Sequence, residues 1–90
     1  MKALLHISIL LSLSSAGAQS FESWSAKAEK VQKRGEATQG IEYWSSALRL
    51  WRKSNGAASR AKALAARAAL YEETGKTEAA LEDLNAAISL

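Results

Sequence analysis

Ser59 and Lys62 are the residues whose types and spacing come nearest to catalytic chemistry. On a helix this spacing brings the amine within one turn of the hydroxyl, where it can act as the base for a serine nucleophile. Enzymes of that kind also carry Ser-Asp-Asn and Lys-Thr-Gly motifs, and neither occurs in this chain. We therefore expect this pair to mark the solvated start of a helix, without a catalytic role.

Gly75, Lys76 and Thr77 follow each other as at the end of a phosphate-binding loop. The first glycine of that motif would fall on Leu70, and the sequence predicts no strand before the loop. The three residues are better explained as a turn between two helices, with Thr77 as the N-cap of the second.

Two acidic pairs, Glu72-Glu73 and Glu82-Asp83, raise the question of general acid and base catalysis. Neighbouring residues on a helix project about 100° apart, so the two carboxylates of a pair do not converge on one point. We expect solvated surface charges without a buried partner.

The three tryptophans offer rings that stack on a sugar or a base. Trp24 and Trp44 fall in helical apolar stripes, which favours packing in the core. Trp51 lies beyond its stripe, where it either covers the following helix or contacts a partner.

The N-terminal segment has the composition of a secretory signal peptide. Lys2 precedes an apolar stretch at 3–13, and Ala16 and Ala18 give the small-x-small pattern before a cleavage site at Gln19. The apolar stretch is much shorter than the ~20 residues that span a bilayer. We expect export to the periplasm or the medium, with residues 1–18 removed and no stable membrane anchor after cleavage. The alternative is an uncleaved helix held against the membrane or within the fold.

Removal of this segment leaves residues 19–90 without histidine or cysteine, because His6 is the only histidine and the chain has no cysteine. Most metal sites and most nucleophile-base pairs need one of these residue types. We therefore expect no enzyme, no metal and no cofactor.

Residues 19–90 repeat themselves at a spacing of forty positions. Identical residues coincide at 26 and 66, 28 and 68, 35 and 75, 42 and 82, 47 and 87, and 50 and 90. Each copy has two apolar stripes of helical period, separated by Gly35 or Gly75. The pattern predicts helices at about 21–34, 37–53, 57–73 and 77–90, and an early start of the third helix after a turn at 54–56.

The two copies resemble the tetratricopeptide repeat (TPR) family, whose pattern places large, small, aromatic and turn residues in this order. Gly40 is the small residue expected to let the paired helices approach closely. The repeat-closing proline is absent, and the spacing is forty instead of 34. The resemblance implies an all-α fold with four helices in about two tandem repeats, an α-solenoid. The first repeat lies at about 21–54 and the second at about 61–90. The matching core positions are Trp24, Ala28, Val31, Gly35, Gly40, Trp44, Ala47, Leu64, Ala68, Tyr71, Gly75, Ala80, Leu84 and Ala87.

Proteins of this family bind other proteins in a groove lined by the first helix of each repeat, and the resemblance implies a protein or peptide partner here. Lys and Asn, which grip a C-terminal carboxylate in one subfamily, are replaced by Ser25 and Glu29, so that clamp is not expected. The expected groove residues are Glu22, Ser25, Glu29, Gln32 and Lys33 in the first copy, and Lys62, Ala65, Ala69, Glu72 and Glu73 in the second.

Charge is distributed unevenly along the chain. Residues 27–67 carry a net +7 and residues 72–83 a net −4. The imbalance would steer an acidic partner or guide head-to-tail stacking of copies, or it is a set of ordinary surface pairs such as Glu29 with Lys33. Nucleic acid is not expected as a partner, because acidic residues interrupt the basic segment.

The last helix leaves Leu81, Leu84 and Ile88 without a following repeat, although about three repeats are usually needed for a stable stack. Three explanations remain open: the chain is a fragment, it self-associates through this helix, or its partner completes the stack. The functional alternatives are accordingly an exported adaptor, the N-terminal recognition segment of a longer exported protein or enzyme, and a self-assembling structural protein.

Overall fold

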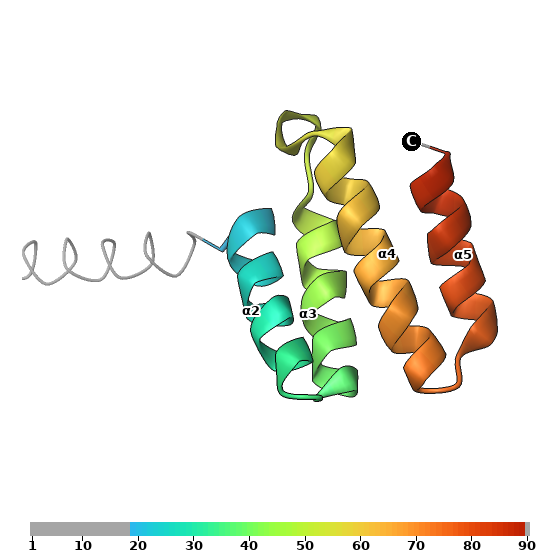
Figure 1. The fold of residues 1–90 in the computed structure, drawn as a ribbon. Coiled ribbons are helices and arrows are strands. Elements are labelled where there is room, and N and C mark those ends of the chain that lie inside the picture. The colour runs from blue at the N-terminus through green and yellow to red at the C-terminus, as the bar shows by residue number, and fades with distance from the viewer. Residues whose placement is uncertain (1–18, 90) are drawn as a thin grey trace, which may run out of the picture.

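The computed structural model describes residues 19–89, which form four α-helices, one short 3-10 helix and no strand. Figure 1 shows the helices side by side in chain order, with both hairpin turns at the same end. The predicted all-α fold of two helical hairpins is confirmed. The predicted signal residues Ala16 and Ala18 lie outside the described part. The elements are α2 (Phe21–Lys33), α3 (Ala37–Leu50), η1 (Lys53–Asn55), α4 (Ala57–Glu73) and α5 (Thr77–Ile88).

Helix α2 begins at a reciprocal cap formed by two serines. The backbone N–H of Ser23 donates to the Ser20 hydroxyl at 3.2 Å, and the backbone N–H of Ser20 donates to the Ser23 hydroxyl at 2.8 Å. Two of the N–H groups that a helix start leaves free are thereby satisfied. This cap fixes the first turn of α2, which carries Phe21 into the core.

The two hairpin turns have the same geometry. Gly35 and Gly75 have φ angles of +77° and +81°, in the left-handed region that glycine adopts most readily. The N–H of the residue after each glycine reaches back to a helix carbonyl: Glu36 to Val31 at 3.0 Å, and Lys76 to Tyr71 at 2.7 Å. These bonds satisfy the free carbonyls at the end of α2 and of α4.

Helix α3 ends at Leu50, three residues before the predicted end. Trp51 is extended, and its indole N–H donates to the Gly56 carbonyl at 2.9 Å. The backbone N–H of Arg52 donates to the Asn55 side chain at 2.8 Å. These bonds form a tight connection in place of another helical turn. Trp51 covers the start of α4, which was one of the two alternatives predicted for this residue.

Helices α4 and α5 begin without a side-chain cap. Helix α4 starts at Ala57 and is the longest of the four, which confirms the predicted early start. The prediction of Thr77 as an N-cap is wrong, because Lys76 occupies the cap position and Thr77 is already helical.

The core lies where α2, α3 and α4 meet. Trp44 is 2% exposed, and its indole N–H donates to the Gln32 side chain at 3.0 Å. The side chain of Leu70 packs over Gly40 so closely that a Cβ at position 40 would lie 2.7 Å from its Cδ1. Gly40 therefore admits a side chain of α4, whereas the prediction assigned its smallness to contact with the paired helix α2. Ala28, Ala47, Ala63 and Phe21 complete the buried cluster.

Several predicted core positions differ from the structure. Trp24 is only partly buried, at the outer edge of α2, and Tyr71 and Ala87 are also partly buried. Leu84 is 40% exposed, because no further helix among the described residues covers α5. Gly35 and Gly75 are exposed turn residues. Buried positions on the predicted list are Ala28, Val31, Gly40, Trp44, Ala47, Leu64, Ala68 and Ala80.

Asp83 corrects the prediction that the acidic pairs are surface charges without a buried partner. Its side chain is buried and accepts two hydrogen bonds from Arg67, at 2.7 and 2.8 Å. The third contact of Arg67 is the Ser45 hydroxyl at 3.0 Å, so this guanidinium joins α3, α4 and α5. The hydrogen bonds to Asp83 raise the pKa of Arg67 above its usual value, which keeps the side chain charged.

Candidate protein-binding cleft

A cleft of about 230 Å³ lies between α2 and α4. Its floor consists of Phe21, Trp44 and Ala63, which belong to the core of the first hairpin and the start of α4. Glu22, Ser25, Ala26 and Glu29 line one side, and Ser59 and Lys62 line the other. Because α2 and α4 are the first helices of their hairpins, the cleft lies where the repeat pattern predicts a groove.

Ser25 contributes a hydroxyl that is buried and has no hydrogen-bond partner among the described residues. An unsatisfied buried polar group costs about 1–3 kcal/mol. Ser25 lines the cleft, so a rotation of its side chain would bring this oxygen to a donor or acceptor on a bound chain.

An ion pair crosses the mouth of the cleft. The Lys62 ammonium lies 3.6 Å from the Glu29 carboxylate, and both side chains are largely exposed. An exposed pair of this kind contributes about 0–1 kcal/mol, so it can separate at little cost when a ligand enters. Glu29 also borders a neighbouring hollow with Gln32 and Lys33, which extends the surface along α2.

The structure thus brings the first-copy groove residues together with only one of those predicted from the second copy, Lys62. The other four are exposed on α4 and line neither hollow: Ala65, Ala69, Glu72 and Glu73.

The sequence prediction of the groove did not include this apolar floor. Phe21 lies one helical turn before Ser25, and Ala63 directly follows Lys62, so both were adjacent to predicted residues. Their participation depends on how closely α2 and α4 approach, and periodicity within one helix does not report that distance.

The other candidates for chemistry are engaged in the fold. The Ser59 hydroxyl lies 2.7 Å from the Asn55 carbonyl and 2.8 Å from the Gly56 carbonyl, whereas the Lys62 ammonium pairs with Glu29. Within residues 19–89, no group of three His, Cys, Asp or Glu side chains is placed to hold a metal ion. None of the helices described there is long and apolar enough to cross a membrane.

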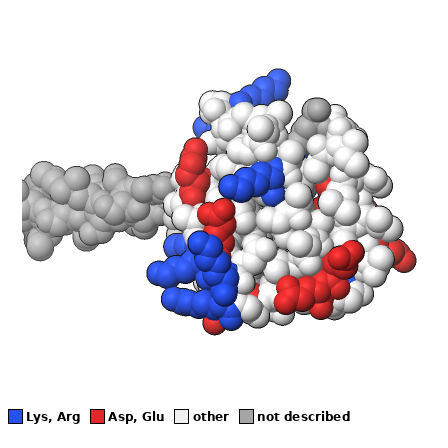
Figure 2. All heavy atoms as spheres, in the orientation of Figure 1, with Lys and Arg blue, Asp and Glu red and all other residues white. Residues whose placement is uncertain are grey.

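Basic side chains predominate at the α2 end of the row of helices, and acidic side chains predominate near the α4–α5 turn. Figure 2 shows a cluster of Lys and Arg side chains over the α2 end, with smaller groups of Asp and Glu above it, and a further cluster of Asp and Glu near the α4–α5 turn. The uneven charge along the sequence therefore persists as a separation in space.

The stacked hairpins and the cleft between their first helices define an α-helical repeat protein of the interaction type. A family model described as tetratricopeptide repeat matches residues 19–90, and the chain belongs to this family. Repeats of this family are non-catalytic and generally mediate protein–protein interaction. Comparison with curated proteins and with solved structures gives no match.

Proposed function

We propose that this chain is an exported adaptor that holds an extended peptide segment of a protein partner in the cleft between α2 and α4. The observation that carries the proposal is the combination in this cleft of an apolar floor with an unpartnered hydroxyl at Ser25.

The size of the cleft favours a peptide side chain over a small-molecule ligand. Pockets for drug-sized ligands usually enclose roughly 300–1,000 Å³, and this cleft encloses about 230 Å³. One apolar side chain fits on the floor of Phe21, Trp44 and Ala63. The peptide backbone beside it supplies an amide group for the Ser25 hydroxyl.

Export is supported by the pattern of residues 1–18, with Lys2, the apolar stretch at 3–13 and the small residues Ala16 and Ala18. Replacing Ala16 and Ala18 with bulky residues should abolish cleavage before Gln19, which the mass of the protein recovered from an export-competent host reports. Efficient cleavage of that variant would contradict the assignment.

Selection from a library of random peptides tests the binding site. We expect the wild type to enrich peptides with an apolar residue at one fixed position. Ala26→Trp, at an exposed position in the cleft lining, should remove this enrichment by filling the cleft. Ser25→Ala should weaken binding of an enriched peptide by about tenfold, as expected for one hydrogen bond.

Thr38→Trp is the matched control, because Thr38 is exposed on α3 and does not line the cleft. Its selection should equal that of the wild type, and circular dichroism should show equal helix content for all variants. Enrichment that survives Ala26→Trp would place the binding site elsewhere.

A further inference from the structure

The outer side of α5 presents an apolar stripe. Leu81, Leu84 and Ile88 are 54%, 40% and 81% exposed, and their spacing of three and four positions puts them on one side of the helix. Glu78 is exposed one helical turn before Leu81, and Glu82, which is also exposed, follows Glu78 by one turn, farther round the helix from the stripe. We call these five residues the C-terminal face.

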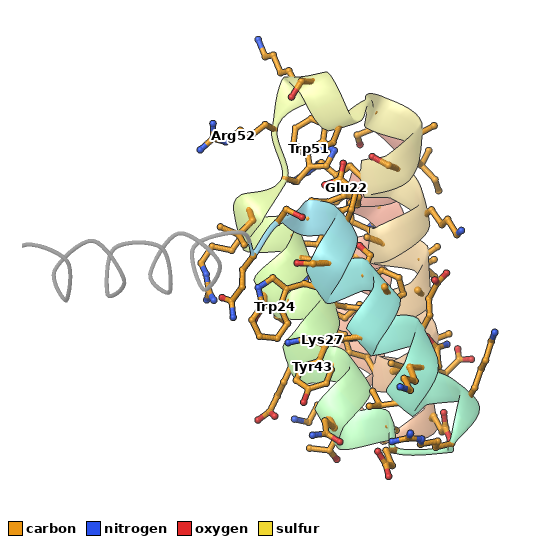
Figure 3. The ribbon with its side chains drawn as sticks, turned by 90° about the vertical axis from the view of Figure 1, so that its left-hand side faces the viewer. Glu22, Trp24, Lys27, Tyr43, Trp51 and Arg52 are labelled. Atoms are coloured by element: carbon orange, nitrogen blue, oxygen red, sulfur yellow. The ribbon has the colours of Figure 1, made fainter. Side chains whose placement is uncertain are left out.

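The opposite end of the row presents a second partly apolar surface. The rings of Trp24 and Tyr43 lie 5.4 Å apart, and the Lys27 ammonium lies 4.6 Å from the Trp24 ring. Figure 3 looks onto this end and shows Trp24, Lys27 and Tyr43 gathered across α2 and α3.

Leu50 and two further cations extend this surface. Leu50 is 38% exposed and lies two helical turns after Tyr43, on the same side of α3. Lys30 and Arg34 are exposed and share a side of α2 with Lys27. We call Trp24, Lys27, Lys30, Arg34, Tyr43 and Leu50 the N-terminal face.

The two faces are complementary in both polarity and charge. Each has an apolar centre, and the cations of one border match the carboxylates of the other. Pairing two C-terminal faces would place only carboxylates on both sides of the contact, and pairing two N-terminal faces would place only cations on both sides. Like charges brought together across an interface cost several kcal/mol, so charge favours the unlike pairing.

We infer that the C-terminal face binds the N-terminal face of a second copy of this chain, head to tail. Each bound copy leaves one N-terminal and one C-terminal face free, so the contact repeats and generates an open-ended row. The interaction is separate from the peptide cleft, since neither face includes a residue that lines it.

Sedimentation velocity tests this association. The full sequence is expressed, and the form of the protein that the host produces is purified and identified by its mass. We expect a dissociation constant on the order of 10 µM, as for a small interface. Species beyond the dimer should appear as the concentration rises from about 1 to about 200 µM, a range that brackets this value. A monomer throughout, or a series that stops at a dimer, would overturn the inference.

Charge reversal identifies the faces. Lys27→Glu with Lys30→Glu should weaken association at least about tenfold, and Glu78→Lys with Glu82→Lys should do the same. All four changes in one chain should restore association, because the borders are again opposite. The control, Lys33→Glu with Lys53→Glu, makes the same change in charge outside both faces and should associate as the wild type.

Mixing two blocked variants separates head-to-tail contact from symmetric contact through α5. Ile88→Lys blocks only the C-terminal face, and the reversed pair at Lys27 and Lys30 blocks only the N-terminal face. At a concentration of about 10 µM each alone should be mostly monomeric, and their mixture should form a dimer that grows no further. Association of the Lys27 and Lys30 variant on its own with the dissociation constant of the wild type would overturn the inference. Ala26→Trp should leave association unchanged, which distinguishes failure here from failure of the peptide site.

Discussion

Trp44 and Leu84 occupy the same place in the two hairpins, forty positions apart, and meet different surroundings. Trp44 is 2% exposed beneath α2 and α4, whereas Leu84 is 40% exposed on α5, which among residues 19–89 contacts only α4 closely. In the described part of the chain, α3 has a helix on each side, and α5 has a helix on one side. In a stacked repeat the neighbour thus decides whether an equivalent apolar position is buried.

The cations at positions 27 and 67 show the same contrast. Lys27 lies over the partly buried Trp24 ring at the end of the row. Arg67 lies between the hairpins and donates to Asp83 and Ser45. Lys27 makes a contact at the surface with one ring, whereas Arg67 joins three helices.

Truncating the equivalent apolar residues should produce the largest difference. We expect Trp44→Ala to lower the free energy of unfolding by about 3–5 kcal/mol, since it empties a buried site. Leu84→Ala should cost less than about 1 kcal/mol, because much of this side chain is already in water. Urea unfolding measures both, and Trp44→Leu keeps the measurement possible if the alanine variant does not fold. Equal losses at 44 and 84 would contradict the contrast.

Removing the two equivalent cations should give the next largest difference. We expect Arg67→Met to cost about 3 kcal/mol, because it leaves the Asp83 carboxylate buried without its partner. Lys27→Met should cost at most about 1 kcal/mol, the value of an exposed cation–π contact. Thermal unfolding provides the comparison. Adding Asp83→Leu to Arg67→Met should recover most of the lost stability. If stability is not recovered, the loss comes mainly from the contacts of Arg67 with groups other than Asp83.

Giving position 40 the alanine found at position 80 should have a smaller effect. We expect Gly40→Ala to cost about 1 kcal/mol, because displacing Leu70 outweighs the gain in helix propensity. In a Leu70→Ala background the same change should cost nothing or stabilise the helix. Chemical denaturation of the wild type, the two single variants and the double variant gives the coupling free energy between positions 40 and 70. If Gly40→Ala lowers the free energy of unfolding equally in both backgrounds, the alanine does not clash with Leu70.

The turn glycines should differ least, since both have positive φ and open space around the position of a Cβ. Gly35→Ala and Gly75→Ala should each cost about 1 kcal/mol, the strain of an alanine in the left-handed region. Differential scanning calorimetry can compare the two variants. A clear inequality would show that the two turns are not equivalent.

Local features of the fold could be predicted because short-range chemistry sets them. Apolar spacing located the four helices, and Gly35 and Gly75 marked the two turns by their tolerance of positive φ. The end of α3 could not be predicted in this way, since it depends on the Trp51 indole reaching the Gly56 carbonyl. The cleft was predicted in part: Glu22, Ser25, Glu29 and Lys62 come from the repeat pattern, and its floor does not.

The sequence by itself determined the helical period, the forty-residue repeat and the family to which residues 19–90 belong. The tertiary structure decided that Asp83 is buried against Arg67, that Gly40 accommodates Leu70, and that the Ser25 hydroxyl has no partner among the described residues. The physical reason is common to all three. Each depends on the distance between helices, which packing of whole hairpins sets and which no periodicity within one helix encodes.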